Sequence, residues 1–236
     1  MGVSYSTYAS CHSALIKNSM GGSIRYAERY VRFDVEALKR VAAKSIGKQL
    51  SDVASICKLA EGGFNRLFRI TMKDGMKIIA KIPYPFTAPK KLATASEAAT
   101  LQFVASYGIP VPHVHAYSAT TNNEVGSEYI IMEEAQGELL RNRWYVIAES
   151  QREDIIRQLV GIEAKLFSIP FPASGSIYFP CDLDPQVKRI GLRDARGDLY
   201  CIGPSAALVL WRNCREKMNV DRGPCRFSQS PQACCL

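Results

Sequence analysis

The stretch KLAEGGFNRLFRITMKDGMKIIAK, residues Lys58–Lys81, is the clearest indication of the fold in this sequence. It has the pattern of a strand, a glycine turn at Glu61–Asn65, a second strand at Leu67–Met72, a hairpin and a third strand at Ile78–Ile82. The hairpin is expected at Asp74-Gly75, because this dipeptide readily supplies the positive φ of a tight turn. The stretch therefore predicts an antiparallel sheet.

Two features of this sheet suit an anionic ligand. Gly62 and Gly63 let the backbone approach another group closely and leave N–H groups free to face an anion. Alternate residues from Ile78 to Ile82 share one face of the third strand, so Lys81 projects from the other face. A lysine held over a glycine turn suits a polyphosphate. An ordinary sheet whose lysine extends its ammonium into water explains the same residues, and the stretch alone leaves both interpretations open.

The composition limits the class of protein. The chain has 236 residues, 47% hydrophobic and 22% charged, which fits one large domain or two small lobes. Because no apolar run approaches the roughly 20 residues that cross a bilayer, we expect no membrane span. The net charge of +8 suits an anionic ligand, a nucleic acid or an import signal. We expect no nucleic-acid partner, because the aromatic residues are not interleaved with basic clusters.

A metal centre is not expected either. The chain has eight cysteines without a CxxC pair and three histidines without zinc-finger spacing, which argues against a structural zinc site. Residues 1–27 contain no acidic residue, are rich in serine and carry Lys17 and Arg25, as mitochondrial transit segments do. We therefore expect a mitochondrial location, and otherwise a cytoplasmic protein with a disordered leader.

The elements on either side of the sheet carry clear boundary signals. Asp34 is a suitable N-cap for a helix over Val35–Ser45, which Gly47 would end. A second helix is expected from about Thr94 to Tyr107. Its predicted core face consists of Ala98, Leu101, Val104 and Ala105.

Glu97 of the second helix lies on the same side as this apolar face. A carboxylate beside an apolar stripe is costly unless a cation compensates its charge, and Lys81 is the obvious candidate. Alternatively, Glu97 is a carboxylate of the first helical turn that the helix dipole stabilises.

The remaining elements are an extended connector at Gly108–Pro112, a buried strand at Glu128–Met132 and a polar hinge at Glu133–Gly137. The capping box Ser150–Glu153 opens a helix that continues to about Ser168. The apolar residues of this helix are expected to face a core: Ile155, Ile156, Leu159, Ile162 and Leu166. From Pro170 onward the chain is rich in turns, and residues 206–215 could form one more helix.

Five pieces stand in a fixed order along the chain: EGGFNRLFRI, IIAKIP, TASEAATLQFV, GIPVPHV and EYIIMEEAQG. Together they resemble the N-terminal lobe of the aminoglycoside-phosphotransferase-like branch of the protein-kinase fold. They are most similar to its fungal members, the group that includes altered inheritance of mitochondria protein 9. Two later segments, YCIGPSAALVLW and NVDRGPC, resemble parts of the C-terminal lobe of the same group.

The resemblance implies an α+β, protein-kinase-like fold. Its N-lobe would span residues 28–136 and consist of an antiparallel sheet with one main helix. A partial helical C-lobe would follow over residues 137–225, and residues 226–236 form a tail that departs from the family.

The resemblance also implies a site for ATP. Lys81 would contact the α- and β-phosphates, and Glu97 would hold that lysine by an ion pair. The turn that covers the phosphates would consist of Gly62, Gly63, Phe64 and Asn65. Met132 would line the back wall of the pocket, and backbone groups of Glu133 and Ala135 would bind adenine.

Phosphate transfer in the family further needs a His-x-Asp-x-x-x-x-Asn loop and a later aspartate that hold magnesium and orient the acceptor. None of the histidines His12, His113 and His115 is followed by an aspartate two positions later. Asp182-Leu183-Asp184 is interpreted as a turn. The family-level function is thus ATP-dependent phosphotransfer to a small hydroxylated acceptor, with this chain expected to be inactive. The alternative is a non-catalytic nucleotide-binding or scaffold protein, similar to pseudokinases.

Overall fold

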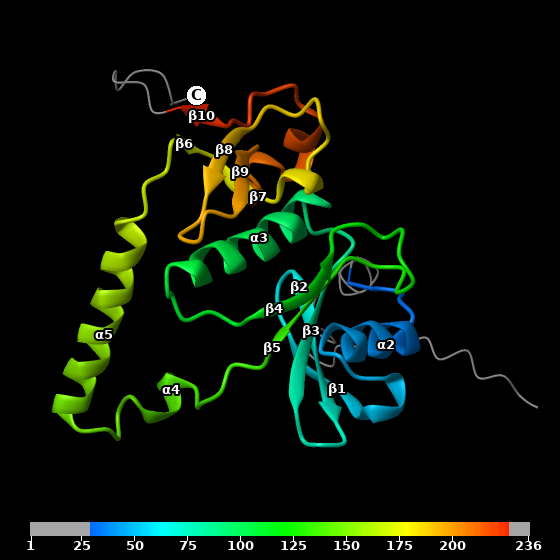
Figure 1. The fold of residues 1–236 in the computed structure, drawn as a ribbon, viewed down its shortest axis with the longest axis vertical. Helices are drawn as coiled ribbons and strands as arrows, with labels where there is room; N and C mark the ends of the chain where they lie inside the picture. The colour runs from blue at the N-terminus through cyan, green and yellow to red at the C-terminus, as the bar shows by residue number, and fades with distance from the viewer. Residues whose placement is uncertain (1–28, 227–236) are drawn as a thin grey trace, which may run out of the picture.

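The computed structural model describes residues 29–226, so the expected leader and all of the tail after residue 226 lie outside the described residues. The described chain is a mixed α+β structure, with a five-stranded and a three-stranded antiparallel sheet on either side of one helix (Figure 1). The predicted α+β class is therefore confirmed.

The larger sheet contains the glycine turn. Its five strands are arranged in the order β1-β2-β3-β5-β4, and each pair of neighbours is antiparallel. Their bounds are Val53–Glu61 for β1, Asn65–Met72 for β2, Lys77–Pro83 for β3, Val114–Ser118 for β4 and Tyr129–Glu133 for β5. At the predicted hairpin Gly75 has a φ of +86°. Strand β4 and the first half of β1 were not predicted from the sequence.

One face of this sheet packs against helix α2, Val35–Ser45. As predicted, Asp34 is its N-cap, and the Asp34 carboxylate accepts a hydrogen bond from the Ala37 N–H at 2.9 Å. Gly47 follows the helix with a φ of +75°, a conformation that glycine adopts at no steric cost. Leu38 of α2 is fully buried against alternate residues of β2 and β3, which form the core of this layer.

Helix α3, Leu92–Ser106, lies between the two sheets (Figure 1). The predicted core face is correct for Ala98 and Val104, whereas Leu101 and Ala105 are partly exposed. Phe103, which was not part of the predicted face, is fully buried. The prediction of a single stripe was wrong, because α3 has a core on each side.

The second core lies between α3 and a smaller sheet with the strand order β7-β9-β8. These strands are Ser176–Tyr178, Leu199–Gly203 and Ile190–Arg193, respectively. Phe103 meets the ring of Tyr200 edge-on, with 5.4 Å between the centroids. A two-stranded ribbon of β6, Ala173–Ser174, and β10, Cys225–Arg226, completes this layer.

The expected helical C-lobe is corrected by the structure. Residues 137–226 contain α4, Leu140–Arg143, and one long helix, α5, Glu149–Phe167, followed by strands and short 3₁₀ helices. These 3₁₀ helices are η3, η4 and η5, with bounds Pro180–Asp182, Leu208–Leu210 and Asn213–Lys217; η4 and η5 replace the single helix considered for residues 206–215. A further short helix, η2, Leu50–Asp52, precedes β1.

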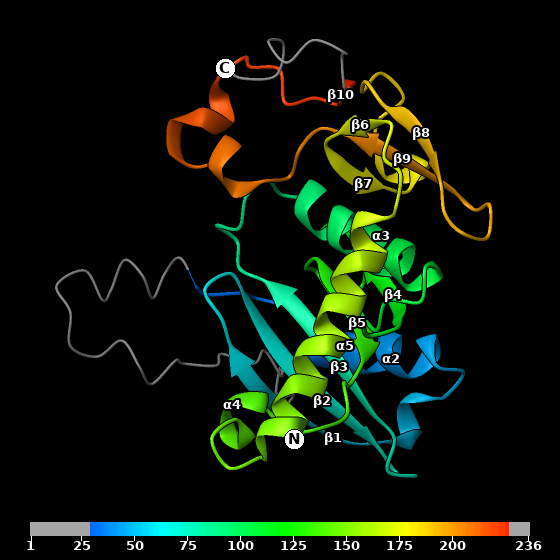
Figure 2. The same cartoon turned by 90° about the vertical axis from the view of Figure 1, so that its left-hand side faces the viewer.

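Helix α5 begins at Glu149, two residues earlier than a Ser150 N-cap implies, and carries a different cap. The Ala148 N–H donates to the side-chain oxygen of Gln151 at 3.1 Å, in place of the Ser150–Glu153 box. Within the described part of the chain, no residue of α5 is buried, so the prediction that its apolar residues face a core was wrong. Figure 1 shows α5 standing apart from the larger sheet, and Figure 2, turned by 90°, shows α5 in front of that sheet.

Among residues 29–226, no helix combines the length and the apolar character that a membrane crossing requires.

Candidate functional site

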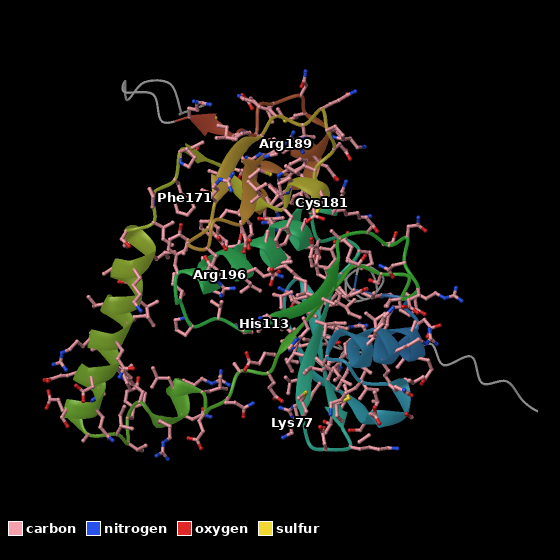
Figure 3. The ribbon with its side chains drawn as sticks, in the orientation of Figure 1. Lys77, His113, Phe171, Cys181, Arg189 and Arg196 are labelled. Atoms are coloured by element: carbon pink, nitrogen blue, oxygen red, sulfur yellow. The ribbon has the colours of Figure 1, made fainter. Side chains whose placement is uncertain are left out.

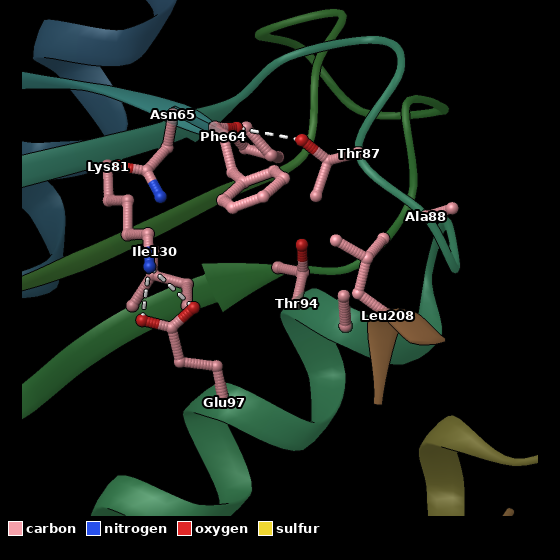
Figure 4. Close-up of a pocket in the computed structure, with 11 residues that line it drawn as sticks. Phe64, Asn65, Lys81, Thr87, Ala88, Thr94, Glu97, Ile130 and Leu208 are labelled. Carbon is pink, nitrogen blue, oxygen red and sulfur yellow. Dashed lines mark hydrogen bonds and ion pairs between the residues drawn. The ribbon is translucent and has the colours of Figure 1, made fainter. Parts of the chain in front are cut away.

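A cavity of about 250 Å³ lies below the glycine turn of the larger sheet (Figure 4). Its walls come from the turn, from β3 and β5, from the loop that joins β3 to α3, from α3 itself and from η4. The lining residues are Phe64, Asn65, Lys81, Pro83, Thr87, Ala88, Ala93, Thr94, Glu97, Ile130 and Leu208.

Lys81 and Glu97 meet in this cavity, so the ion pair expected from the sequence is formed. The Lys81 ammonium contacts both carboxylate oxygens of Glu97, at 2.6 Å for Oε2. The side chains are 19% and 38% exposed, so the pair adds little to stability. An ammonium has three N–H donors, and the carboxylate uses two of them, which leaves one for a ligand. The ion pair therefore orients the lysine without saturating it.

Glu97 owes its position to the start of α3. Lys91, at the N-cap, has a φ of +65°, a strained value for a non-glycine residue. The Glu128 carboxylate, which lies just before β5, accepts hydrogen bonds from the Lys91 N–H at 3.1 Å and the Thr94 hydroxyl at 2.5 Å. A carboxylate at this end also complements the helix dipole. Sequence reasoning missed this contact, since it placed Glu128 in the buried strand.

The glycine turn itself is closed by a hydrogen bond from the Gly62 N–H to the Asn65 carbonyl at 2.9 Å. Neither Gly62 nor Gly63 has a positive φ, so the backbone of the turn does not require glycine. Among the described residues, nothing lies within 4 Å of a Cβ placed on Gly63. The absence of a side chain at Gly63 leaves open space beside the turn.

A buried ion pair lies at the base of the turn, where β1 ends and β2 begins. Arg66 Nε is 2.9 Å from Glu61 Oε1, although the two are not aligned as a hydrogen bond. Lys58 approaches the same carboxylate oxygen at 3.4 Å. The Arg66 side chain is only 4% exposed, and its guanidinium lies over the Tyr84 ring. This pair was not predicted from the sequence, where Glu61 belonged to the expected turn and Arg66 lay between that turn and the expected strand Leu67–Met72.

The predicted adenine-binding residues lie outside the lining of this cavity. Met132 packs with Val114 and Ile130 near α3. The Glu133 N–H donates to the His113 carbonyl at 2.9 Å, and Ala135 is exposed. The structure thus brings together four predicted residues, Phe64, Asn65, Lys81 and Glu97, and leaves the lining without Gly62, Gly63, Met132, Glu133 and Ala135.

Two polar contacts near the hinge had no signal in the sequence. Arg69 on β2 donates to the Glu134 carboxylate, with Nε 2.9 Å from Oε1. This contact raises the pKa of Arg69. On β4, burial and the neighbouring His113 lower the pKa of His115 below its usual value. Figure 3 shows His113 beside the sheet and Lys77 at the hairpin end of β3.

The described residues do not fit a magnesium site. In residues 29–226, no group of three or more His, Cys, Asp and Glu side chains could hold a metal ion. Asp182 accepts a hydrogen bond from the Tyr117 hydroxyl at 2.8 Å, and Asp184 pairs with Lys91 at 3.2 Å. Burial, followed by this bond to Asp182, raises the pKa of Tyr117. The structure places Asp182 at the end of η3 and Asp184 in the loop that follows, so these aspartates do not form the single turn that was predicted.

Comparison with known proteins gives fungal relatives, whereas no family model matches the chain. A subtelomeric hrmA-associated cluster protein of Aspergillus fumigatus is 44% identical over 174 residues, 73% of this chain and 33% of that protein. Altered inheritance of mitochondria protein 9 of Candida albicans is 31% identical over 175 residues, 68% of this chain and 28% of that protein. The protein of the same name from Clavispora lusitaniae is 29% identical over 206 residues, 80% of this chain and 34% of that protein.

The chain thus spans about a third of the length of the curated relatives it matches. Relatives named altered inheritance of mitochondria protein 9, expected from the resemblance, are among them. Their names describe them as mitochondrial proteins, and this supports the mitochondrial location expected for this chain.

Proposed function

We propose that this chain has a kinase-like nucleotide site and binds the polyphosphate of ATP beneath its glycine turn. The observation that carries the proposal is the Lys81 ammonium, which both carboxylate oxygens of Glu97 hold inside the cavity. A fixed ammonium with one remaining donor suits a phosphate oxygen, because charge-assisted hydrogen bonds are the stronger class.

Three further observations support an anionic ligand at this position. The space beside Gly63 is open in the described structure, so a phosphate can approach the backbone of the turn. The Thr87 side chain lines the same cavity, and its hydroxyl donates to the Phe64 carbonyl at 2.7 Å, which keeps this carbonyl oxygen bonded to the loop. The net charge of +8 favours anionic ligands in general.

In the family that the sequence resembles, such a site serves ATP-dependent transfer of phosphate to a small hydroxylated molecule. For this chain we propose binding without transfer. The sequence contains no His-x-Asp-x-x-x-x-Asn loop, and residues 29–226 contain no group of carboxylates that fits magnesium. Lys81 and Glu97 can position a phosphate, but they do not activate an acceptor hydroxyl.

Binding can be tested with a fluorescent ATP analogue in the presence and absence of Mg²⁺, using a matched pair of lysine variants. Lys81→Ala should weaken binding roughly 10- to 100-fold, the range for a hydrogen bond to a charged group. Lys77→Ala is the control, because Lys77 lies on the same strand but is exposed at the hairpin end (Figure 3). Absence of binding by the unaltered chain, or equal effects of the two substitutions, would contradict the proposal.

Turnover must be measured separately from binding. We expect the unaltered chain to release no more phosphate from MgATP than the Lys81→Ala variant does. Turnover that disappears in Lys81→Ala would support the nucleotide site and refute the proposal that the chain does not transfer phosphate.

The exposed apolar residues of α5 favour a second candidate function, a non-catalytic scaffold. Leu159 and Val160 are 53% and 55% exposed, and Phe167 is 86% exposed. Large exposed apolar surfaces commonly mark interaction sites. A purified chain that is monodisperse by light scattering and does not bind the ATP analogue would favour this candidate over nucleotide binding. Aggregation that rises with concentration would argue against it.

A further inference from the structure

The tip of the glycine turn is attached to the loop that follows β3. The Phe64 carbonyl accepts a hydrogen bond from the Tyr84 N–H at 2.9 Å. It accepts another from the Thr87 hydroxyl at 2.7 Å (Figure 4). We propose that Thr87 is a positioning residue that holds the turn over the cavity and thereby sets the affinity for the nucleotide. This inference rests on the proposed nucleotide site.

The loop is the better-anchored partner of the two. Pro83, Pro85 and Pro89 each fix one φ angle. Tyr84 is 2% exposed, and its ring stacks on Phe86 with 5.6 Å between the centroids. Phe64, in contrast, is 47% exposed at the tip of the turn. The two hydrogen bonds to the Phe64 carbonyl therefore let the loop fix the conformation of the turn.

The base of the turn is anchored to the same tyrosine. The guanidinium of Arg66, which is paired with Glu61, lies 5.4 Å from the centre of the Tyr84 ring. The Phe86 ring, which stacks on Tyr84, also lies beside Phe64, with 6.4 Å between the Phe86 and Phe64 ring centroids. Both ends of the turn thus depend on Tyr84, whereas Thr87 adds a side-chain contact at the tip.

The direction of the Phe64 carbonyl matters for an anionic ligand. A carbonyl oxygen has two lone pairs, and Tyr84 and Thr87 occupy both of them. The oxygen is thereby directed at the loop, where its partial negative charge does not oppose a phosphate. If this peptide could rotate freely, its oxygen would face the ligand in part of the molecules. The apparent affinity for the nucleotide would then fall in proportion to the fraction of molecules whose turn is in the binding conformation.

The test compares two substitutions at Thr87. Thr87→Val keeps the shape of the side chain and removes the hydroxyl, whereas Thr87→Ser keeps the hydroxyl. We expect Thr87→Val to weaken binding of the fluorescent ATP analogue about three- to tenfold, the effect of one net hydrogen bond. Amide hydrogen exchange in residues 61–66 should become faster in the same variant. Thr87→Ser should bind within about twofold of the unaltered chain.

The outcomes separate this inference from the nucleotide proposal. If Lys81→Ala loses binding but Thr87→Val binds like the unaltered chain, the nucleotide site stands and the role of Thr87 is refuted. If the unaltered chain does not bind the analogue, both proposals fail. Unchanged hydrogen exchange in Thr87→Val would overturn the attachment of the turn whatever the affinity shows. A thermal melt of each variant confirms that it is folded.

Discussion

Replacing Phe103 by alanine tests whether α3 joins the two sheets into one cooperative structure. Phe103 is fully buried, and the rings of Tyr107, Phe171 and Tyr200 surround it at centroid distances of 5.2, 5.8 and 5.4 Å. Truncating a buried phenylalanine costs about 3–5 kcal/mol of unfolding free energy, because the transfer free energy is lost and a cavity remains. We expect Phe103→Ala to fall in this range.

The assay is urea unfolding followed by tryptophan fluorescence, together with hydrogen exchange of both sheets. Phe167→Ala is the matched control, because Phe167 is 86% exposed and should cost less than about 0.5 kcal/mol. In Phe103→Ala, exchange should become faster in β2 and β3 as well as in β7–β9. A cost below about 1 kcal/mol would refute the burial argument. Faster exchange confined to β7–β9 would refute the claim that the two sheets unfold together.

Two further predictions concern α5 and the histidine pair. Leu159→Glu should change the unfolding free energy by less than about 0.5 kcal/mol and raise solubility, because Leu159 is 53% exposed; a cost of several kcal/mol in the same urea assay would show that α5 packs against a core. Burial lowers the pKa of His115 in the folded chain. Below about pH 6.5 the unfolded chain therefore takes up a proton more readily than the folded chain does. The stability contributed by neutral His115 is lost as the pH falls towards the pKa of the folded chain. Between pH 7.5 and 5.5 the unaltered chain should therefore lose more stability than His115→Gln does, and equal losses would contradict this sign.

The elements of the first layer were predictable because their signals are local. Asp34 and Gly47 mark the two ends of α2, and Asp74-Gly75 marks the hairpin. Each of these residues acts within a few positions of itself through capping or turn geometry. Such signals do not depend on what the element packs against, and the structure confirms all three.

Burial was harder to predict, since it depends on partners that a local pattern does not contain. The apolar residues of α5 are spaced as on a core-facing helix, yet Leu159 is more than half exposed. For α3 the sequence predicted too little burial rather than too much. One stripe was predicted around Ala98, whereas the second sheet also buries the side that carries Phe103. Periodicity identifies a helix and one of its faces, but it does not count the surfaces that pack on it.

The Lys81–Glu97 pair could be predicted because the alternation of side chains along a strand fixes the face that carries Lys81, and the helical repeat fixes the side that carries Glu97. The residues that fix their surroundings could not. Glu128 is 37 residues from Lys91, whose N–H it binds, and Thr87 is 23 residues from the Phe64 carbonyl. Such contacts follow from the path of the chain in space, which spacing alone does not give.

These two contacts lie on one segment, the chain between β3 and α3. Thr87 attaches this segment to the tip of the glycine turn, and Lys91, at its other end, starts the helix that carries Glu97. The roof of the cavity and the carboxylate that orients Lys81 are therefore held by neighbouring parts of the same loop. A displacement of that loop would move the turn and Glu97 together, whereas Lys81, on the central strand β3, would stay in place. The geometry of the ion pair thus depends on this loop as much as on the two residues that form it.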